Sequence, residues 1–183
     1  MTERSGLGGT KLRAAGQEQQ RNGRSDEEAH HAYCTIFYNP GMEYDLEKLS
    51  KEIVVERLKD AEDPHQLAAE VARKIAISAV ASTRTQQDPH MTVAAACRGV
   101  MQGILLLEKD LPKTAVALLA QMALVAEETN LDPAECMTWA MEGIAPICRL
   151  AAHGTGEAVG AAIEERFMGA GHVFAGMLRT AGS

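Results

Sequence analysis

Beyond residue 45, apolar residues recur at helical spacing along most of the chain, and this pattern predicts an all-α protein. The expected helices cover residues 45–60, 64–86, 90–109, 112–129, 133–152 and 156–180. The apolar stripe of the first one contains Leu46, Leu49, Ile53, Val54 and Leu58. We therefore expect a bundle of about six helices of roughly 15–25 residues each, the usual outcome when every helix has one apolar face to bury.

Aspartate followed by proline marks most of the predicted helix starts. Asp63-Pro64, Asp88-Pro89 and Asp132-Pro133 each place a capping carboxylate before a proline at the first helical position, and Asp110-Leu111-Pro112 is a looser version. Gly154-Thr155 resembles a helix stop followed by a new cap. These starts follow one another at nearly even intervals with short loops, which places successive helices antiparallel.

The predicted helices 90–109 and 112–129 are apolar around most of their circumference. Such helices are central elements or oligomer contacts. Two G-x-x-x-G patterns, at Gly99 and Gly103 and at Gly156 and Gly160, would let another helix approach closely. Close packing within the core and a seam between subunits both fit them, and we take these four glycines as candidate interface residues.

The N-terminal region differs from the rest of the chain. Residues 1–31 are polar and glycine-rich, which predicts a disordered tail, either a solvated leader or an arm that folds onto a partner. Residues 32–44 contain Tyr33, Phe37 and Tyr38, so we expect an extended segment that packs on its own body or pairs with a second copy. Residues 32–183 are expected to form one domain, with 45–60 as a docking helix and 63–180 as the core helices.

Composition narrows the class of protein. Aromatic residues make up 4% of the chain, which argues against a strand-rich sandwich or barrel. The net charge of −7 disfavours nucleic-acid binding, and the most apolar run, residues 115–126, is too short for a membrane span. The four cysteines form no C-x-x-C pair and no secretory signal is visible, so we expect a reducing, cytoplasmic compartment.

The nine methionines suggest one candidate binding site. Met137 and Met141 lie around Trp139, and with His172 and Phe174 they are candidate liners of an interhelical pocket for a small molecule or an unidentified cofactor. Gap-filling in an alanine-rich core is the simpler explanation of the methionines. His172, on a mostly apolar stretch, fits a core or interface histidine better than a ligand or a general base.

The sequence supports a catalytic site less well than it supports a binding surface. Cys136 follows a helix start, where the dipole favours a thiolate, although the adjacent Glu135 opposes it. The E-x-x-H pairs Glu27/His30, Glu28/His31 and Glu62/His65 lack the helical context of a di-iron site, so no metal site is assigned. We therefore expect a non-catalytic helical protein that acts by self-association, as a homodimer or other homo-oligomer, or by binding a protein partner. A ligand-binding protein and an enzyme of unknown class remain alternatives.

Overall fold

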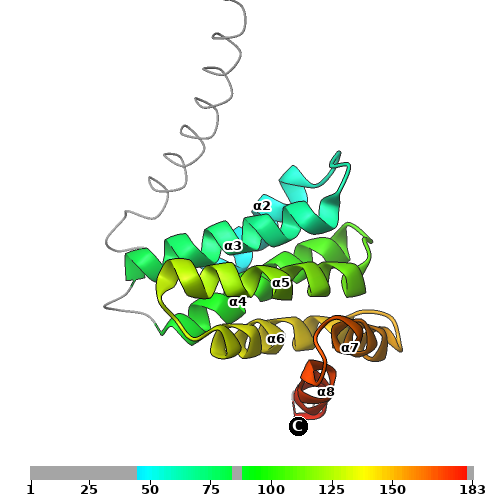
Figure 1. Cartoon of the computed structure of the whole chain (residues 1–183). Coiled ribbons are helices and arrows are strands. Elements are labelled where there is room, and N and C mark those ends of the chain that lie inside the picture. Colours follow the sequence, from blue (N-terminus) through cyan, green and yellow to red (C-terminus); the bar gives the residue numbers. More distant parts are fainter. Residues whose placement is uncertain (1–44, 84–87, 181–183) are drawn as a thin grey trace, which may run out of the picture. The chain divides into compact units, whose positions relative to one another are not determined.

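The computed structural model describes residues 45–83 and 88–180, and within these ranges every regular element is an α-helix. Figure 1 shows their arrangement. The helices are α2 (Leu46–Arg57), α3 (Pro64–Thr83), α4 (Pro89–Leu106), α5 (Leu111–Thr129), α6 (Pro133–Leu150), α7 (Thr155–Arg166) and α8 (Ala170–Thr180). The all-α prediction is therefore confirmed for the described part of the chain. The predicted tail and the aromatic segment, including Tyr33, Phe37 and Tyr38, lie outside the described residues.

Aspartate side chains cap the helices where the sequence predicts them. Asp88 accepts a hydrogen bond from the backbone N–H of His90 at 3.0 Å, and Asp132 accepts from the N–H groups of Ala134 and Glu135 at 2.9 and 3.0 Å. Asp110 accepts from the N–H of Lys113 at 2.9 Å. Each carboxylate satisfies donors that have no partner inside the helix. The helix starts could be placed from sequence because this chemistry is local.

The prediction of a single helix over residues 156–180 is wrong. The chain breaks after Arg166, and Gly169 adopts a left-handed backbone conformation with φ of +90° before α8 begins. Glycine adopts this conformation without the steric cost that a Cβ would impose. Within the described residues there are thus seven helices instead of six, and they span 11–20 residues instead of 15–25.

α4 lies at the centre of the bundle, in contact with α2, α3, α5 and α6. Its nearly all-round apolar surface is explained by this position, because neighbouring helices cover it on several sides. α2 rests directly on Gly99 and Gly103, where an added Cβ would lie 2.1 Å from the carbonyl oxygen of Glu47 and 2.6 Å from Cγ1 of Val54. The first G-x-x-x-G pattern therefore provides a close helix contact within this chain.

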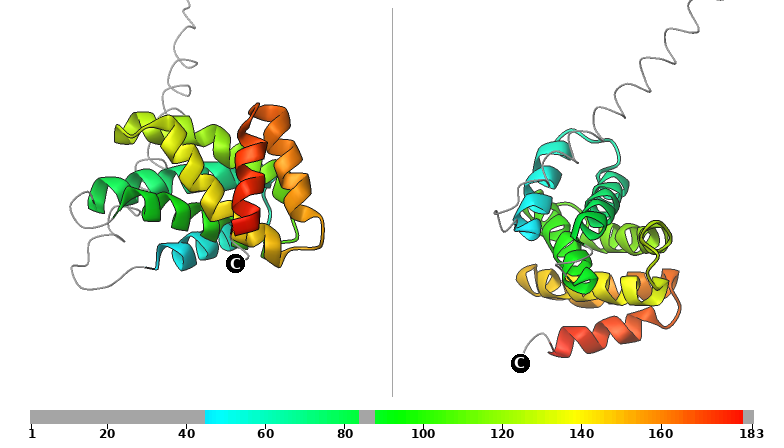
Figure 2. Two further views of the ribbon diagram at one scale, coloured as in Figure 1. Left: turned by 90° about the horizontal axis from the view of Figure 1, so that it is seen from below. Right: turned by 90° about the vertical axis from the view of Figure 1, so that its left-hand side faces the viewer.

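Successive helices from α3 to α6 alternate in direction (Figure 1). Close packing nevertheless pairs helices two apart in the chain, namely α2 with α4, α4 with α6 and α3 with α5. α7 packs on α5, and α8 lies against α7 and α6 on the outer side of these helices (Figure 2). This arrangement encloses α4 while it leaves one side of α5 open.

Candidate functional site

One face of α5 is apolar and open to solvent. We call it the α5 face and define it by Lys113, Val116, Ala117, Ala120, Ala123, Leu124 and Glu127. Ala120, Ala123 and Leu124 are exposed, and Val116 and Ala117 are half-buried. Leu124 has 38% of its surface exposed, although leucine is a typical core residue. The opposite face of α5, which includes Leu118 and Met122, fills the core.

A groove adjoins the first half of this face. Its volume is about 720 Å³, and α5 and the end of α7 form its walls. Val116, Ala117, Ala120 and Ala162 supply the apolar lining. The charged residues Asp110, Lys113, Glu165 and Arg166 also border the groove. The groove can therefore receive an apolar side chain that is followed by a charged group.

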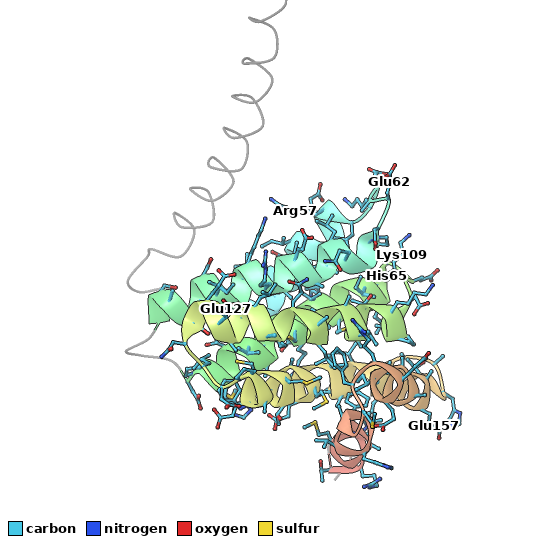
Figure 3. The ribbon with its side chains drawn as sticks, in the orientation of Figure 1. Arg57, Glu62, His65, Lys109, Glu127 and Glu157 are labelled. Carbon is cyan, nitrogen blue, oxygen red and sulfur yellow. The ribbon has the colours of Figure 1, made fainter. Side chains whose placement is uncertain are left out.

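The two ends of the α5 face carry opposite charges. Lys113 lies in the first turn, and its Nζ is 3.4 Å from Oδ2 of Asp110 in an exposed pair. Glu127 lies near the other end of the helix, where Figure 3 labels it, and has no ion-pair partner among the described residues. This order opposes the helix dipole, which favours acidic side chains at the start of a helix and basic ones at its end. The stability of α5 alone does not explain these two charges.

A second cluster joins the start of α4 to α6. The imidazole of His90 stacks on the indole of Trp139, with ring centroids 5.6 Å apart and planes inclined by 29°. Nε2 of the same imidazole pairs with Oε2 of Glu142. His90 and Trp139 are both half-buried. Neither Trp139 nor Glu142 is near His90 in sequence, so the sequence alone did not indicate these contacts.

The buried thiols do not support a reactive cysteine. Cys97, Cys136 and Cys148 are free and buried. Burial raises the pKa of Cys97 and of Cys148 to about 12. Burial also raises the pKa of Cys136, and the nearby carboxylates of Asp132 and Glu135 act in the same direction. Desolvation therefore opposes the helix dipole at Cys136 and disfavours a reactive thiolate there.

The five predicted pocket residues lie in different environments. Phe174 and Met141 are buried in the core, and Met137 is partly buried against it. Trp139 stacks on His90, as described above. His172 is exposed on α8 and is therefore not a core histidine, whereas its interpretation as an interface histidine stays a prediction. None of the five lines the groove beside α5, and the prediction that they form a ligand pocket stays a prediction.

The second G-x-x-x-G pattern also faces this chain's own helices. A Cβ at Gly156 would lie 3.1 Å from Cδ1 of Leu178, and one at Gly160 would lie 3.6 Å from Cδ1 of Phe174. Both contacts are with α8. All four pattern glycines thus meet helices of the same chain. The sequence predicted residues 112–129 as a central element or an oligomer contact, but not which side of this helix stays open. The only sequence signal of the α5 face was the apolar circumference of this helix.

No group of three or more histidine, cysteine, aspartate or glutamate side chains is placed to hold a metal ion among the described residues. In the same part of the chain, no helix combines the length and apolar character needed to cross a membrane. No protein-family model, curated protein or solved structure matches this chain.

Proposed function

We propose that this chain is a non-catalytic helical protein that acts by association with protein chains, in the first place with copies of itself. The α5 face carries this proposal. It combines an exposed leucine and three exposed or half-buried alanines with no charge between Lys113 and Glu127. Apolar helix faces that remain open in one chain are typical of surfaces that another chain covers.

The net charge and the buried thiols also support a non-catalytic protein that binds protein chains in a reducing compartment. The net charge of −7 disfavours nucleic acid as a partner, because it repels phosphates. The three free, buried thiols fit a reducing compartment, so a cytoplasmic location remains part of the proposal. The buried thiols with raised pKa values also favour a non-catalytic function over a cysteine-dependent enzyme.

A second candidate function is small-molecule binding in the groove between α5 and α7. Its volume of about 720 Å³ lies within the common range for ligand sites, roughly 300–1,000 Å³. The alanine side chains would suit an apolar molecule, and the two basic and two acidic residues at the border would suit a polar end group on it. The two functions predict different masses for the purified protein.

Native mass spectrometry of the untagged full chain separates them. We expect dimers or higher multiples of the 19.6 kDa chain without added mass. A monomer that carries a stoichiometric extra mass would contradict self-association and favour the ligand. A monomer without extra mass, at concentrations up to about 100 µM, would contradict the self-association proposal.

A further inference from the structure

We infer that the α5 face binds the α5 face of a second copy of this chain, with the two helices antiparallel and crossing at Ala120. This inference rests on the proposed self-association and adds the partner, the orientation and the register. It follows from the order of side chains along the α5 face and from their charges.

The residues of the α5 face are arranged symmetrically about Ala120. Lys113 and Glu127 each lie seven residues from it, or about two helical turns, so all three lie along one line of the helix. An antiparallel pair centred on Ala120 therefore places Lys113 of each chain opposite Glu127 of the second copy. A two-fold axis repeats this pair, so that one self-complementary surface gains two charge contacts.

Side-chain size is complementary in the same register. Val116 and Ala123 lie on one side of the central line, and Ala117 and Leu124 lie on the other. In the antiparallel pair, Val116 meets Ala123 of the second copy, and Leu124 meets Ala117. Each large side chain thus faces a small one, and alanine at the crossing point lets the helices approach closely. The groove beside Val116 and Ala117 provides space for Leu124 of the second copy.

The charges themselves favour this pairing over a role within one chain. A lysine in the first turn and a glutamate near the last turn both oppose the helix dipole. The exposed pair between Lys113 and Asp110 contributes little to the stability of the fold. In the antiparallel dimer, the same two charges become attractive across the interface.

Charge reversal tests the inference without harming the helix. Lys113→Glu and Glu127→Lys each place like charges opposite one another twice in the dimer, while each places a charge that the dipole of α5 favours. We expect either variant to raise the dimer dissociation constant about tenfold to a hundredfold, and the double variant to restore it, in sedimentation experiments on the full chain. The exposed Lys48 and Glu62 supply the controls: Lys48→Glu and Glu62→Lys change net charge equally and should leave the constant unchanged.

A disulfide test reads the register directly. In a Cys34→Ser background, Ala120→Cys would place two thiols together on the two-fold axis, and oxidation with diamide should yield a covalent dimer. The matched control is Ala123→Cys, whose copies would be offset by about 9 Å along the helices and should cross-link poorly. Circular dichroism of each variant establishes that the helices are intact.

The outcomes distinguish this inference from the proposed function. Rescue by the double charge reversal, together with selective cross-linking at residue 120, supports the antiparallel α5 pair. If the chain dimerises but neither reversal weakens the dimer, or if residue 123 cross-links as readily as residue 120, this inference is overturned and self-association stands. If the wild-type chain stays monomeric up to about 100 µM, both are overturned.

Discussion

The side chain of Glu164 in α7 accepts a hydrogen bond from the backbone N–H of Gly171, in the first turn of α8, with 2.9 Å between Oε2 and N. Its other oxygen, Oε1, accepts from the N–H of Gly169, also at 2.9 Å. Glu164 thus satisfies donors at the start of α8, a role that aspartate plays at α4, α5 and α6. One carboxylate thereby fixes the turn that divides α7 from α8.

This cap predicts an acid-sensitive α8. The N–H of Gly169 lowers the pKa of Glu164 from its ordinary value, and the N–H of Gly171 and the charge of His172 act in the same direction. A carboxyl whose pKa is lower in the folded state stabilises the fold above its unfolded pKa, and this stabilisation is lost as pH falls through the folded value. Thermal unfolding across acidic pH measures the loss. Glu164→Gln should unfold at lower temperature near neutral pH and depend less on acid, and an unchanged acid response in that variant would contradict the cap.

Gly171 should tolerate no side chain. A Cβ there would lie 2.6 Å from Cβ of Glu164 and 2.7 Å from the carbonyl oxygen of Gly160. Gly171→Ala must therefore push α8 away from α7, and we expect a loss of about 1–3 kcal/mol in the free energy of unfolding, measured with urea. Gly176 is a matched control in the same helix, since the nearest atom to its added Cβ is 4.0 Å away. Gly176→Ala should raise stability by about 0.5–1 kcal/mol, and equal losses in both variants would rule out the steric explanation.

Gly99 in the first G-x-x-x-G pattern should tolerate a side chain less well than Gly160 in the second. Gly99→Ala would place a Cβ 2.1 Å from the backbone oxygen of Glu47, which a side-chain rotation cannot relieve. We expect a cost of about 1–3 kcal/mol or more, with partial displacement of α2. Gly160→Ala, in the second pattern, meets only Phe174 at 3.6 Å, an ordinary contact, and should be neutral or slightly stabilising. Hydrogen exchange of α2 amides would locate the effect, and protected amides in Gly99→Ala would argue against it.

The two G-x-x-x-G patterns pack differently although their sequences have the same form. The spacing is identical, yet a Cβ at Gly99 would overlap the backbone of Glu47 whereas one at Gly160 would only touch Phe174. That difference depends on which helix lies above each glycine, and this is a property of the tertiary packing. Helix starts at Asp88, Asp110 and Asp132 could be predicted, because capping uses residues within one turn.

The His90–Trp139 contact and the open side of α5 could not be predicted from local sequence, because both depend on residues far apart in the chain. The stacking of His90 on Trp139 joins positions far apart in the chain, and the apolar pattern of residues 112–129 did not reveal which side of α5 stays open. The break at Gly169 was missed because the apolar stripe continues through it from Ile163 to Phe174. The left-handed glycine and the cap by Glu164 override that periodicity.

Trp139 is the single tryptophan of the chain, so its fluorescence reports on the contact with His90. His90→Ala removes the stacked ring and opens the indole to water, and we expect the emission maximum to move to longer wavelength. His172→Ala is the control, since His172 is exposed on α8. The emission of Trp139 in His172→Ala should match that in the wild-type chain. An unchanged spectrum in His90→Ala would contradict the stacked arrangement.

Thiol labelling tests the burial of Cys97, Cys136 and Cys148. In a Cys34→Ser chain only these three can react, and a thiol must lose its proton before it attacks a labelling reagent. Since burial raises the pKa of Cys97 and Cys148 to about 12 and also raises that of Cys136, the neutral thiol predominates at pH 8 in the folded protein. We expect slow labelling by iodoacetamide under native conditions and rapid labelling of all three in denaturant. Labelling of Cys136 should be quantified separately by mass spectrometry, because this residue lies in the first turn of α6. Fast labelling at Cys136 alone under native conditions would show that the dipole of α6 outweighs desolvation there. Cys136 would then be a reactive cysteine.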